Sequence, residues 1–212
     1  MIIGRYISTK IKNFRIRLTI IVSKFQFYCF GIDFGKKLEV MGYVYLDLDQ
    51  TSKITIGDNF TMSSGDFINP LCKNIKGEIH AGKNARLKIG DNVGLSSPCI
   101  WVSKRVEIMN NVMIGGNTII IDTDAHSLDW KLRSSTRKTE DGTPINVAAA
   151  DSKPIIIEDD VMVGANCVIL KGVRIGARSV IGAGSIVTKN IPSDCIAAGN
   201  PCRVVRSLDS KK

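Results

Sequence analysis

The chain has 212 residues, of which 44% are hydrophobic, only 6% are aromatic and 19 are glycine. This length supports one sizeable core, and the six cysteines lack CxxC or histidine-paired metal spacing, which indicates reduced thiols in a reducing compartment. The net charge is +9, and residues 1–30 contribute +6 of it because they contain no acidic residue. They lack a recognisable nucleic-acid-binding module. We therefore expect a cytoplasmic protein with no bound metal and no nucleic-acid partner.

The first predicted element is a basic amphipathic helix, or a pair of helices, within residues 1–35. Its hydrophobic residues recur at spacings of three and four: Ile3, Ile7, Ile11, Phe14, Leu18, Ile21 or Val22, and Phe25. The apolar run from Leu18 to Val22 is too short to span a bilayer, and no signal peptide is recognisable. Two roles stay open: the helix caps the end of the structure that follows, or residues 1–30 make a peripheral contact with an anionic membrane.

A six-residue hydrophobic period dominates residues 36–206. Its aliphatic positions include Ile157, Val163, Ile169, Ile175, Ile181 and Val187. Neither a helix nor a single strand has this period, but short strands joined by tight corners into a solenoid do. Small or β-branched residues occupy a second position of the hexad, at Val161, Cys167, Val173, Ser179 and Ser185, and glycine follows the aliphatic residue at Gly164, Gly176 and Gly182. Cys167 is thus expected to pack in the core.

The same pattern extends toward the N-terminus. Ile108, Ile114 and Ile120 form a second run, and Ile89, Leu95 and Trp101 form a third, one residue out of step. The tetrapeptide Ile-Gly-Asp-Asn occurs at 56–59 and again at 89–92, which indicates equivalent corners of successive coils. The sequence therefore predicts an all-β solenoid.

The hexads stop at a predicted loop excursion, residues 126–153. His126 stands at its entrance, with Asp122 and Asp124 close upstream to fix its tautomer or raise its pKa. A long insertion in a compact repeat is usually functional or disordered, and His126 favours function. The other histidine, His80, lies in an ordinary corner context and is predicted to be structural. Residues 207–212 form a C-terminal tail.

One stretch carries a specific resemblance. Residues 155–205 read IIIEDDVMVGANCVILKGVRIGARSVIGAGSIVTKNIPSDCIAAGNPCRVV and, with the phrase DTDAHSLD at 122–129, resemble the hexapeptide-repeat acyltransferases, above all the galactoside, maltose and capsular-sugar O-acetyltransferases. This resemblance covers residues 50–206. It implies a left-handed parallel β-helix, a rare exception to right-handed crossover connections. It also implies a homotrimer with acetyl-coenzyme A (acetyl-CoA) in the cleft between subunits.

The resemblance also assigns roles to individual residues. His126 takes the place of the general base, and a backbone N–H of the neighbouring chain near Gly164 and Ala165 would stabilise the oxyanion. Coenzyme contacts map onto Gly164, Ala165, Gly182, Ala183, Thr188, Lys189, Arg203 and Arg206, and acceptor contacts map onto Ser96, Ser97 and Asp124. Met162 replaces the family's usual tryptophan and serine replaces its acceptor-binding asparagine, so a simple galactoside is a weaker candidate acceptor.

The resulting prediction is an acetyl-CoA-dependent O-acetyltransferase that acts directly on a sugar or saccharide hydroxyl, for example in surface-polysaccharide synthesis. Two alternatives stay open: an N-acetyltransferase on an amino-sugar nucleotide, and a non-catalytic β-helix scaffold.

Overall fold

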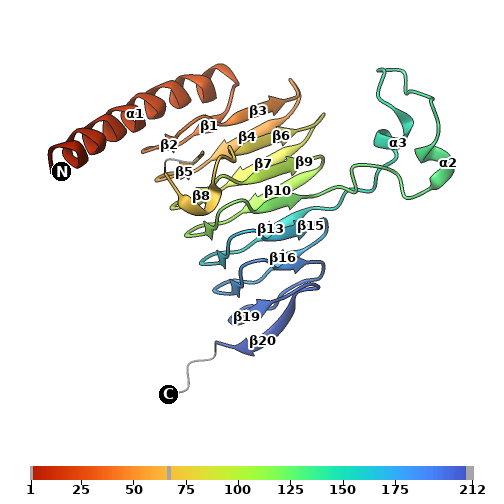
Figure 1. Cartoon of the computed structure of the whole chain (residues 1–212). Helices are drawn as coiled ribbons and strands as arrows, with labels where there is room; N and C mark the ends of the chain where they lie inside the picture. Colours follow the sequence, from red (N-terminus) through yellow and green to blue (C-terminus); the bar gives the residue numbers. More distant parts are fainter. Residues whose placement is uncertain (1, 66–67, 209–212) are drawn as a thin grey trace.

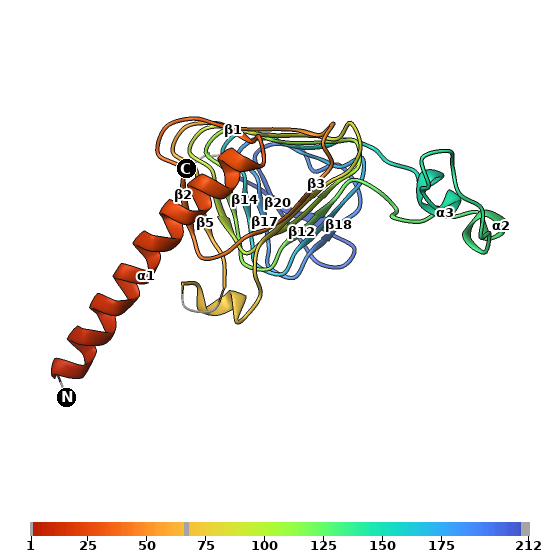
Figure 2. The ribbon, with the colours of Figure 1, turned by 90° about the horizontal axis from the view of Figure 1, so that it is seen from above.

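The computed structural model describes residues 2–65 and 68–208, and the side chains from residue 10 onward. Residues 209–212 of the predicted tail therefore lie outside the described part. The chain forms a three-sided coil with one long helix, α1 (Ile2–Cys29), across its N-terminal end and an excursion on one side (Figures 1 and 2). The first strand begins at Asp33, inside the predicted 1–35 segment.

Each side of the coil is one sheet, in which neighbouring strands come from successive turns. Sheet A contains β1 (Asp33–Phe34), β4 (Lys53–Ile56), β7 (Arg86–Ile89), β10 (Arg105–Ile108), β13 (Ile155–Ile157) and β16 (Arg174–Ile175). Sheet B contains β2 (Glu39–Met41), β5 (Thr61–Ser63), β8 (Gly94–Ser96), β11 (Met113–Ile114), β14 (Met162–Val163), β17 (Val180–Ile181), β19 (Cys195–Ala198) and β20 (Arg203–Ser207). Sheet C contains β3 (Tyr45–Leu48), β6 (Glu78–Ala81), β9 (Cys99–Val102), β12 (Ile119–Ile121), β15 (Val168–Leu170) and β18 (Ile186–Val187). All the pairings in these sheets are parallel except β19 with β20, which is antiparallel.

The hexads fill the interior as predicted. The aliphatic residues from Ile157 to Val187 are at most 2% exposed, and the small partner positions, Cys167 among them, are buried too. Trp101 is the exception. Ile100 and Val102 point inward instead, because the turn at Ser97 and Pro98 places the next interior residue five positions after Leu95 rather than six. Trp101 consequently lies on the outer face of sheet C.

The corners repeat from coil to coil, as the duplicated tetrapeptide predicted. Asn59, Asn92 and Asn111 adopt positive φ of 56° to 58°, a conformation that asparagine tolerates. Their side-chain amides form a ladder, with Asn59 donating to Asn92 at 2.9 Å and Asn92 donating to Asn111 at 3.0 Å. At another corner, a Cβ on Gly164 would lie 2.5 Å from the Ala183 nitrogen, so only glycine fits. This stacking fixes the corner geometry along the coil.

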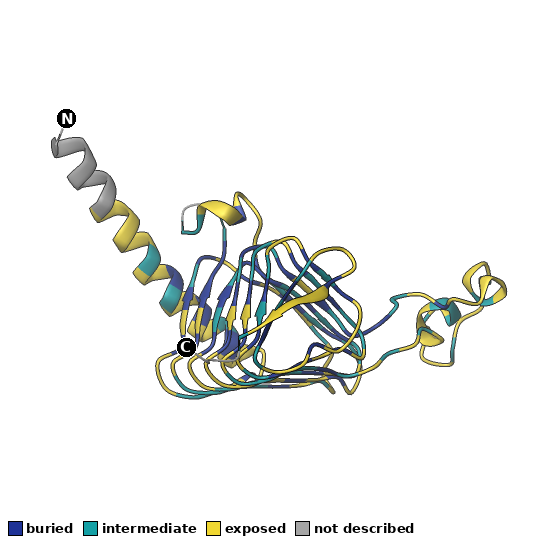
Figure 3. Ribbon diagram, turned by 90° about the horizontal axis from the view of Figure 1, so that it is seen from below, coloured by how far each residue is buried: buried dark blue, intermediate teal, exposed yellow. Residues whose placement is uncertain are grey.

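The helix α1 lies on the first coil and caps it, but its predicted hydrophobic stripe is not the face that packs there. Thr19, Ser23 and Phe27 are buried against the coil, whereas Phe14 and Phe25 of the predicted stripe are 67% and 69% exposed (Figure 3). Ile3 and Ile7 lie outside the described side chains. The polar face packs on the coil because the edge of the first coil has unpaired backbone groups. Thr19 accepts from the Gly42 N–H at 3.0 Å, and Ser23 donates to the Gly42 carbonyl at 3.3 Å.

The excursion is an ordered segment, not a structureless insertion. Its neck is a short antiparallel pair, in which Thr123 bridges Ser152 and the Asp124 N–H donates to the Asp151 carbonyl at 3.0 Å. Beyond the neck lie α2 (Trp130–Arg133) and α3 (Ile145–Ala148). A smaller excursion between β5 and β6 contains the 3-10 helix η1 (Pro70–Cys72). Among the described residues, no helix combines the length and apolarity that a bilayer crossing requires.

Asp122 gives a test of how the neck is anchored. Its buried carboxylate accepts the backbone N–H groups of Ser103, Lys104 and Arg105 at 2.6 to 2.7 Å. Replacing Asp122 with Ala leaves these donors without their acceptor, so the free energy of unfolding should fall by about 3 kcal/mol. Urea denaturation measures this. Asp91→Ala, which removes a comparable bond at an exposed corner, should cost less than about 1 kcal/mol, and equal losses would contradict the assignment.

Candidate active site

The predicted base, His126, is exposed and stands where the chain leaves the corner between sheets C and A. Its N–H donates to the Asp124 carbonyl at 2.7 Å, and the next N–H, of Ser127, donates to the Asn146 carbonyl at 2.7 Å. The side-chain Nδ2 of Asn146 lies 3.3 Å from the His126 Nδ1. The Asn146 Oδ1 is buried and has no hydrogen-bond partner among the described residues. The excursion thus folds back and packs α3 against the histidine.

Neither upstream carboxylate contacts the imidazole, which corrects the expectation for Asp122 and Asp124. Asp122 is occupied by backbone donors, and Asp124 binds the Lys171 Nζ at 2.6 Å. Lys171 also binds Asp151, again at 2.6 Å, and so joins the two strands of the neck. Hydrogen bonds that Lys171 donates to both carboxylates raise the pKa of Lys171, and its bond to Asp151 lowers the pKa of that carboxyl. The two ion pairs of Lys171 therefore clamp the base of the excursion beneath His126.

Four of the eight predicted coenzyme residues lie at a different corner, between sheets B and C. Gly164 and Ala165 follow β14, and Gly182 and Ala183 follow β17 directly beneath them. The Gly164 N–H donates to the Ile181 carbonyl at 2.8 Å, whereas the Ala165 N–H has no acceptor among the described residues. The corner therefore presents a backbone donor that the coil itself does not use.

The remaining coenzyme residues divide between the two corners. Thr188 and Lys189 are exposed and follow β18 at the corner between sheets C and A. Arg203 and Arg206 are exposed on β20, where Arg203 pairs with Ala198 at the end of β19. One coil thus carries basic side chains at both edges of sheet C.

The acceptor residues divide in the same way. Ser96 ends β8 at the corner between sheets B and C, and its hydroxyl lies 3.2 Å from that of Ser63. Ser97 is 1% exposed and accepts the Gly65 N–H at 3.2 Å, so its side chain faces the protein interior. Asp124 lies at the other corner, beside His126. The structure does not bring these three residues together within one chain.

The two corners are too far apart to contact one reacting group. Ala165 lies just before β15 and His126 lies beyond the end of β12, its parallel neighbour. From Ala165 to Leu170 the chain covers five extended positions of about 3.3 Å each, so the two edges of sheet C are on the order of 15 Å apart. Within a single chain, the predicted base and the predicted coenzyme corner are therefore held apart.

The outer faces of the sheets differ in polarity. Sheet A presents mainly charged side chains, including Arg86, Lys88, Arg105 and Arg174. The C-terminal coils of sheets B and C instead present apolar side chains: Met113, Met162, Val180, Ile119, Val168 and Ile186. Met113 is 59% exposed and Met162 is 44% exposed. Contiguous apolar surface of this kind is typical of protein–protein contacts.

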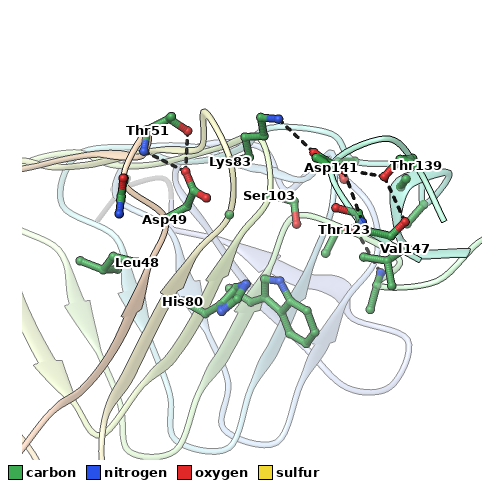
Figure 4. Close-up of a pocket in the computed structure, with 18 of the residues that line it drawn as sticks. Leu48, Asp49, Thr51, His80, Lys83, Ser103, Thr123, Thr139, Asp141 and Val147 are labelled. Atoms are coloured by element: carbon green, nitrogen blue, oxygen red, sulfur yellow. Dashed lines mark hydrogen bonds and ion pairs between the residues drawn. The ribbon is translucent and has the colours of Figure 1, made fainter. Parts of the chain in front are cut away.

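A cavity that the sequence analysis missed lies between the outer face of sheet C and the excursion. It has a volume of about 1360 Å³, and His80, Trp101 and Lys83 line its coil side (Figure 4). Lys83 reaches across it to Asp141 at 3.0 Å. The predicted structural role of His80 rested on a corner context, but His80 lies within strand β6 and its Nδ1 is 2.7 Å from Asp47. Asp47 and His80 are 33 residues apart, the same spacing as the duplicated tetrapeptide, so that repeat length was the signal for their pairing.

No group of three or more His, Cys, Asp or Glu side chains within residues 2–65 and 68–208 is arranged to hold a metal ion. The chemistry available at the two corners is proton transfer by an imidazole and hydrogen-bond donation by backbone and basic side chains.

Comparison with known proteins identifies the repeat. Residues 154–189 match the family model described as the hexapeptide repeat of succinyl-transferase. The chain is 42% identical over 100 residues to a galactoside O-acetyltransferase of Lactococcus lactis, covering 47% of this chain and 42% of that enzyme. It is 48% identical over 65 residues to a 2,3,4,5-tetrahydropyridine-2,6-dicarboxylate N-acetyltransferase of Staphylococcus aureus, covering 29% and 27% of the two chains. The matches thus span less than half the length of these curated relatives.

Two solved structures share the fold over most of the chain. A hexapeptide-repeat acetyltransferase of Vibrio cholerae in complex with acetyl-CoA is 28% identical, with a TM-score of 0.52 over 87% of this chain and 75% of that one. A galactoside acetyltransferase in complex with coenzyme A is 30% identical, with a TM-score of 0.52 over 84% of this chain and 65% of that one. The predicted left-handed parallel β-helix is confirmed by these neighbours. The chain therefore contains a hexapeptide repeat and has the left-handed β-helix fold, and it resembles the galactoside and maltose O-acetyltransferases.

Proposed function

We propose that the protein is an acetyl-CoA-dependent O-acetyltransferase that transfers the acetyl group directly to a hydroxyl of a sugar or saccharide. The observation that carries this proposal is that the two corners hold two different catalytic groups. One holds His126, a base at the mouth of the excursion, and the other holds the unused Ala165 N–H. Direct acyl transfer needs these two functions, together with a bound thioester.

His126 is the general base in this reaction. Rotating the Asn146 amide by half a turn brings its orphaned Oδ1 onto the His126 Nδ1, which fixes the Nδ1–H tautomer and leaves Nε2 free. Nε2 takes the proton of the acceptor hydroxyl as that oxygen attacks the thioester carbonyl. The Ala165 N–H donates to the oxyanion that forms. Collapse of this intermediate breaks the carbon–sulfur bond, and the leaving thiolate takes the proton from the imidazolium.

Acetyl-CoA lies, on this proposal, between two copies of the chain in a homotrimer. The edges of sheet C are on the order of 15 Å apart, so His126 and Ala165 of the same chain cannot contact one thioester. We therefore place His126 of one copy opposite the Ala165 corner of the next copy. The apolar outer faces of sheets B and C supply the contact surface, and the charged sheet A stays in solvent. Gly164 and Gly182 let the pantetheine arm lie close to the coil, while Lys189, Arg203 and Arg206 meet the phosphates.

The acceptor enters the cavity on sheet C. Trp101 offers a half-buried apolar ring, and the His80–Asp47 pair and Lys83 offer hydrogen-bond donors and acceptors around it. That combination suits a hydroxyl-rich ring. We place the enzyme in the cytoplasm, in surface-polysaccharide synthesis, with residues 1–30 in contact with the inner face of the membrane.

The second candidate is N-acetylation of an amino-sugar nucleotide. The identity to the Staphylococcus aureus N-acetyltransferase supports transfer to nitrogen, although the substrate in that enzyme's name is a dicarboxylate and not an amino sugar. Purified protein, labelled acetyl-CoA and a panel of sugars, nucleotide sugars and amino sugars separate the two. An alkali-labile ester product supports O-acetylation, and a stable amide supports the second candidate. If no panel member is acetylated and the thioester is never turned over, the protein is a non-catalytic scaffold.

The role of His126 can be tested with the best acceptor from that panel. His126→Ala removes the base and leaves the coenzyme surface intact, so kcat should fall by roughly 10²- to 10⁴-fold. Coenzyme affinity, measured by calorimetry, should stay near that of the wild type. Leu128→Ala changes another exposed side chain of the same excursion and should keep full activity. Full activity in His126→Ala would show that another group is the base.

The shared site predicts complementation between inactive chains. His126→Ala disables one half-site, and Ala165→Trp blocks the other, so each variant alone should be inactive. Co-expressed with different affinity tags and purified through both, they should recover activity, because every mixed trimer then has about one cleft in three with two intact halves. Light scattering on the same sample measures the trimer mass. Mixed oligomers without activity would place the whole site within one chain.

A further inference from the structure

We infer that α1 is a two-sided adaptor, whose one face holds the first coil and whose opposite, apolar face inserts into the surface of an anionic lipid bilayer. The exposed side of the helix carries a continuous hydrophobic stripe. Its members are Ile11, Phe14, Leu18, Ile21, Val22, Phe25 and Tyr28, which are between 40% and 75% exposed. At 3.6 residues per turn they fall within about 120° of the helix circumference. This inference rests on the membrane contact in the proposed function and assigns that contact to the hydrophobic stripe.

The coil cannot accommodate this stripe, because the rotation of the helix is fixed from the other side. Phe27 is fully buried in the core, and Thr19 and Ser23 bond the backbone of Gly42. The Gln26 side chain donates to the Val44 carbonyl at 3.2 Å. Ser23 and Phe27 lie about 160° around the axis from the centre of the stripe, Thr19 about 120° and Gln26 about 100°. Turning the stripe inward would break all these contacts and expose Phe27.

The charges around the stripe favour lipid as its occupant. The N-terminal part of the chain, residues 1–32, contains no acidic residue. Arg17 and Lys24 are exposed and lie along one border of the stripe, about 80–100° from its centre. A helix with an apolar face bordered by basic side chains lies in the plane of a membrane and is attracted by anionic headgroups. A second copy of this chain, with its own net positive charge, would meet the same basic borders with repulsion.

The position of α1 then sets the orientation of the protein. The helix lies across the end of the coil, and its N-terminal half projects beyond the coil (Figures 1 and 2). With the stripe in the membrane, the coil axis stands away from the bilayer. His126 follows β12, three strand spacings of about 4.8 Å below β3 in sheet C. The candidate base is therefore held on the order of 15 Å below the first coil, and farther than that from the helix layer.

Vesicle co-sedimentation of the full chain tests this inference without any assay of acetyl transfer. The wild type should bind vesicles of phosphatidylcholine mixed with phosphatidylglycerol, and should bind pure phosphatidylcholine vesicles at least 10-fold more weakly. Phe14→Ser combined with Ile21→Ser and Phe25→Ser should lose at least 10-fold of the binding to the mixed vesicles. These three side chains do not pack on the coil, so circular dichroism and thermal unfolding should remain unchanged.

Two further variants sharpen the result. Arg17→Gln with Lys24→Gln should weaken binding to the mixed vesicles and reduce its dependence on salt. Leu128→Ser with Leu71→Ser removes exposed hydrophobic side chains elsewhere and should bind like the wild type. The inference fails if the triple-serine variant binds vesicles as the wild type does. It fails equally if the wild type does not bind vesicles and the triple-serine change alters the oligomer mass measured by light scattering. The stripe would then join copies of the chain.

Discussion

The narrow interior of the three-sided coil is the constraint on which the rest of the structure depends. Each side of each turn admits one aliphatic side chain, such as Ile169 or Ile181, with a small neighbour such as Cys167 beside it. Successive turns must stack in register for these residues to fill the space, and parallel strand pairing provides that register. The corners therefore recur at fixed places, and side chains that leave the coil do so only along its edges or its three outer faces.

This constraint explains why the candidate site is divided. A flat side of the coil separates the corner that bears His126 from the corner that bears Ala165, and no bending of the coil can bring them together without breaking the hexads. A catalytic arrangement on such a scaffold is most easily completed by a second copy. The apolar outer faces of sheets B and C, represented by Met113 and Ile119, fit that requirement, whereas the charged outer face of sheet A does not.

Polar contacts orient both appended segments, and at α1 they act together with the burial of Phe27. The first coil exposes unpaired backbone groups at Gly42, and the hydroxyls of Thr19 and Ser23 satisfy them, which turns the apolar stripe of α1 away from the coil. At the excursion, Lys171 binds Asp124 and Asp151 and holds the neck closed. Capping the coil and binding a membrane were alternatives at the level of sequence. They become compatible once the helix is seen to use opposite faces.

The sequence by itself determined the solenoid, its interior residues and its repeated corners, because a six-residue period reflects geometry within a single turn. It also pointed to the excursion through the loss of that period. It did not reveal the Asp47–His80 pair or the outward position of Trp101, since both depend on contacts between turns and on a single shortened corner. The exposed stripe of α1 and the separation of His126 from Ala165 likewise emerged only in the tertiary structure. A hydrophobic stripe does not say which face meets the core, and a motif does not say which corner of a prism it occupies, because both are settled by packing against residues distant in the chain.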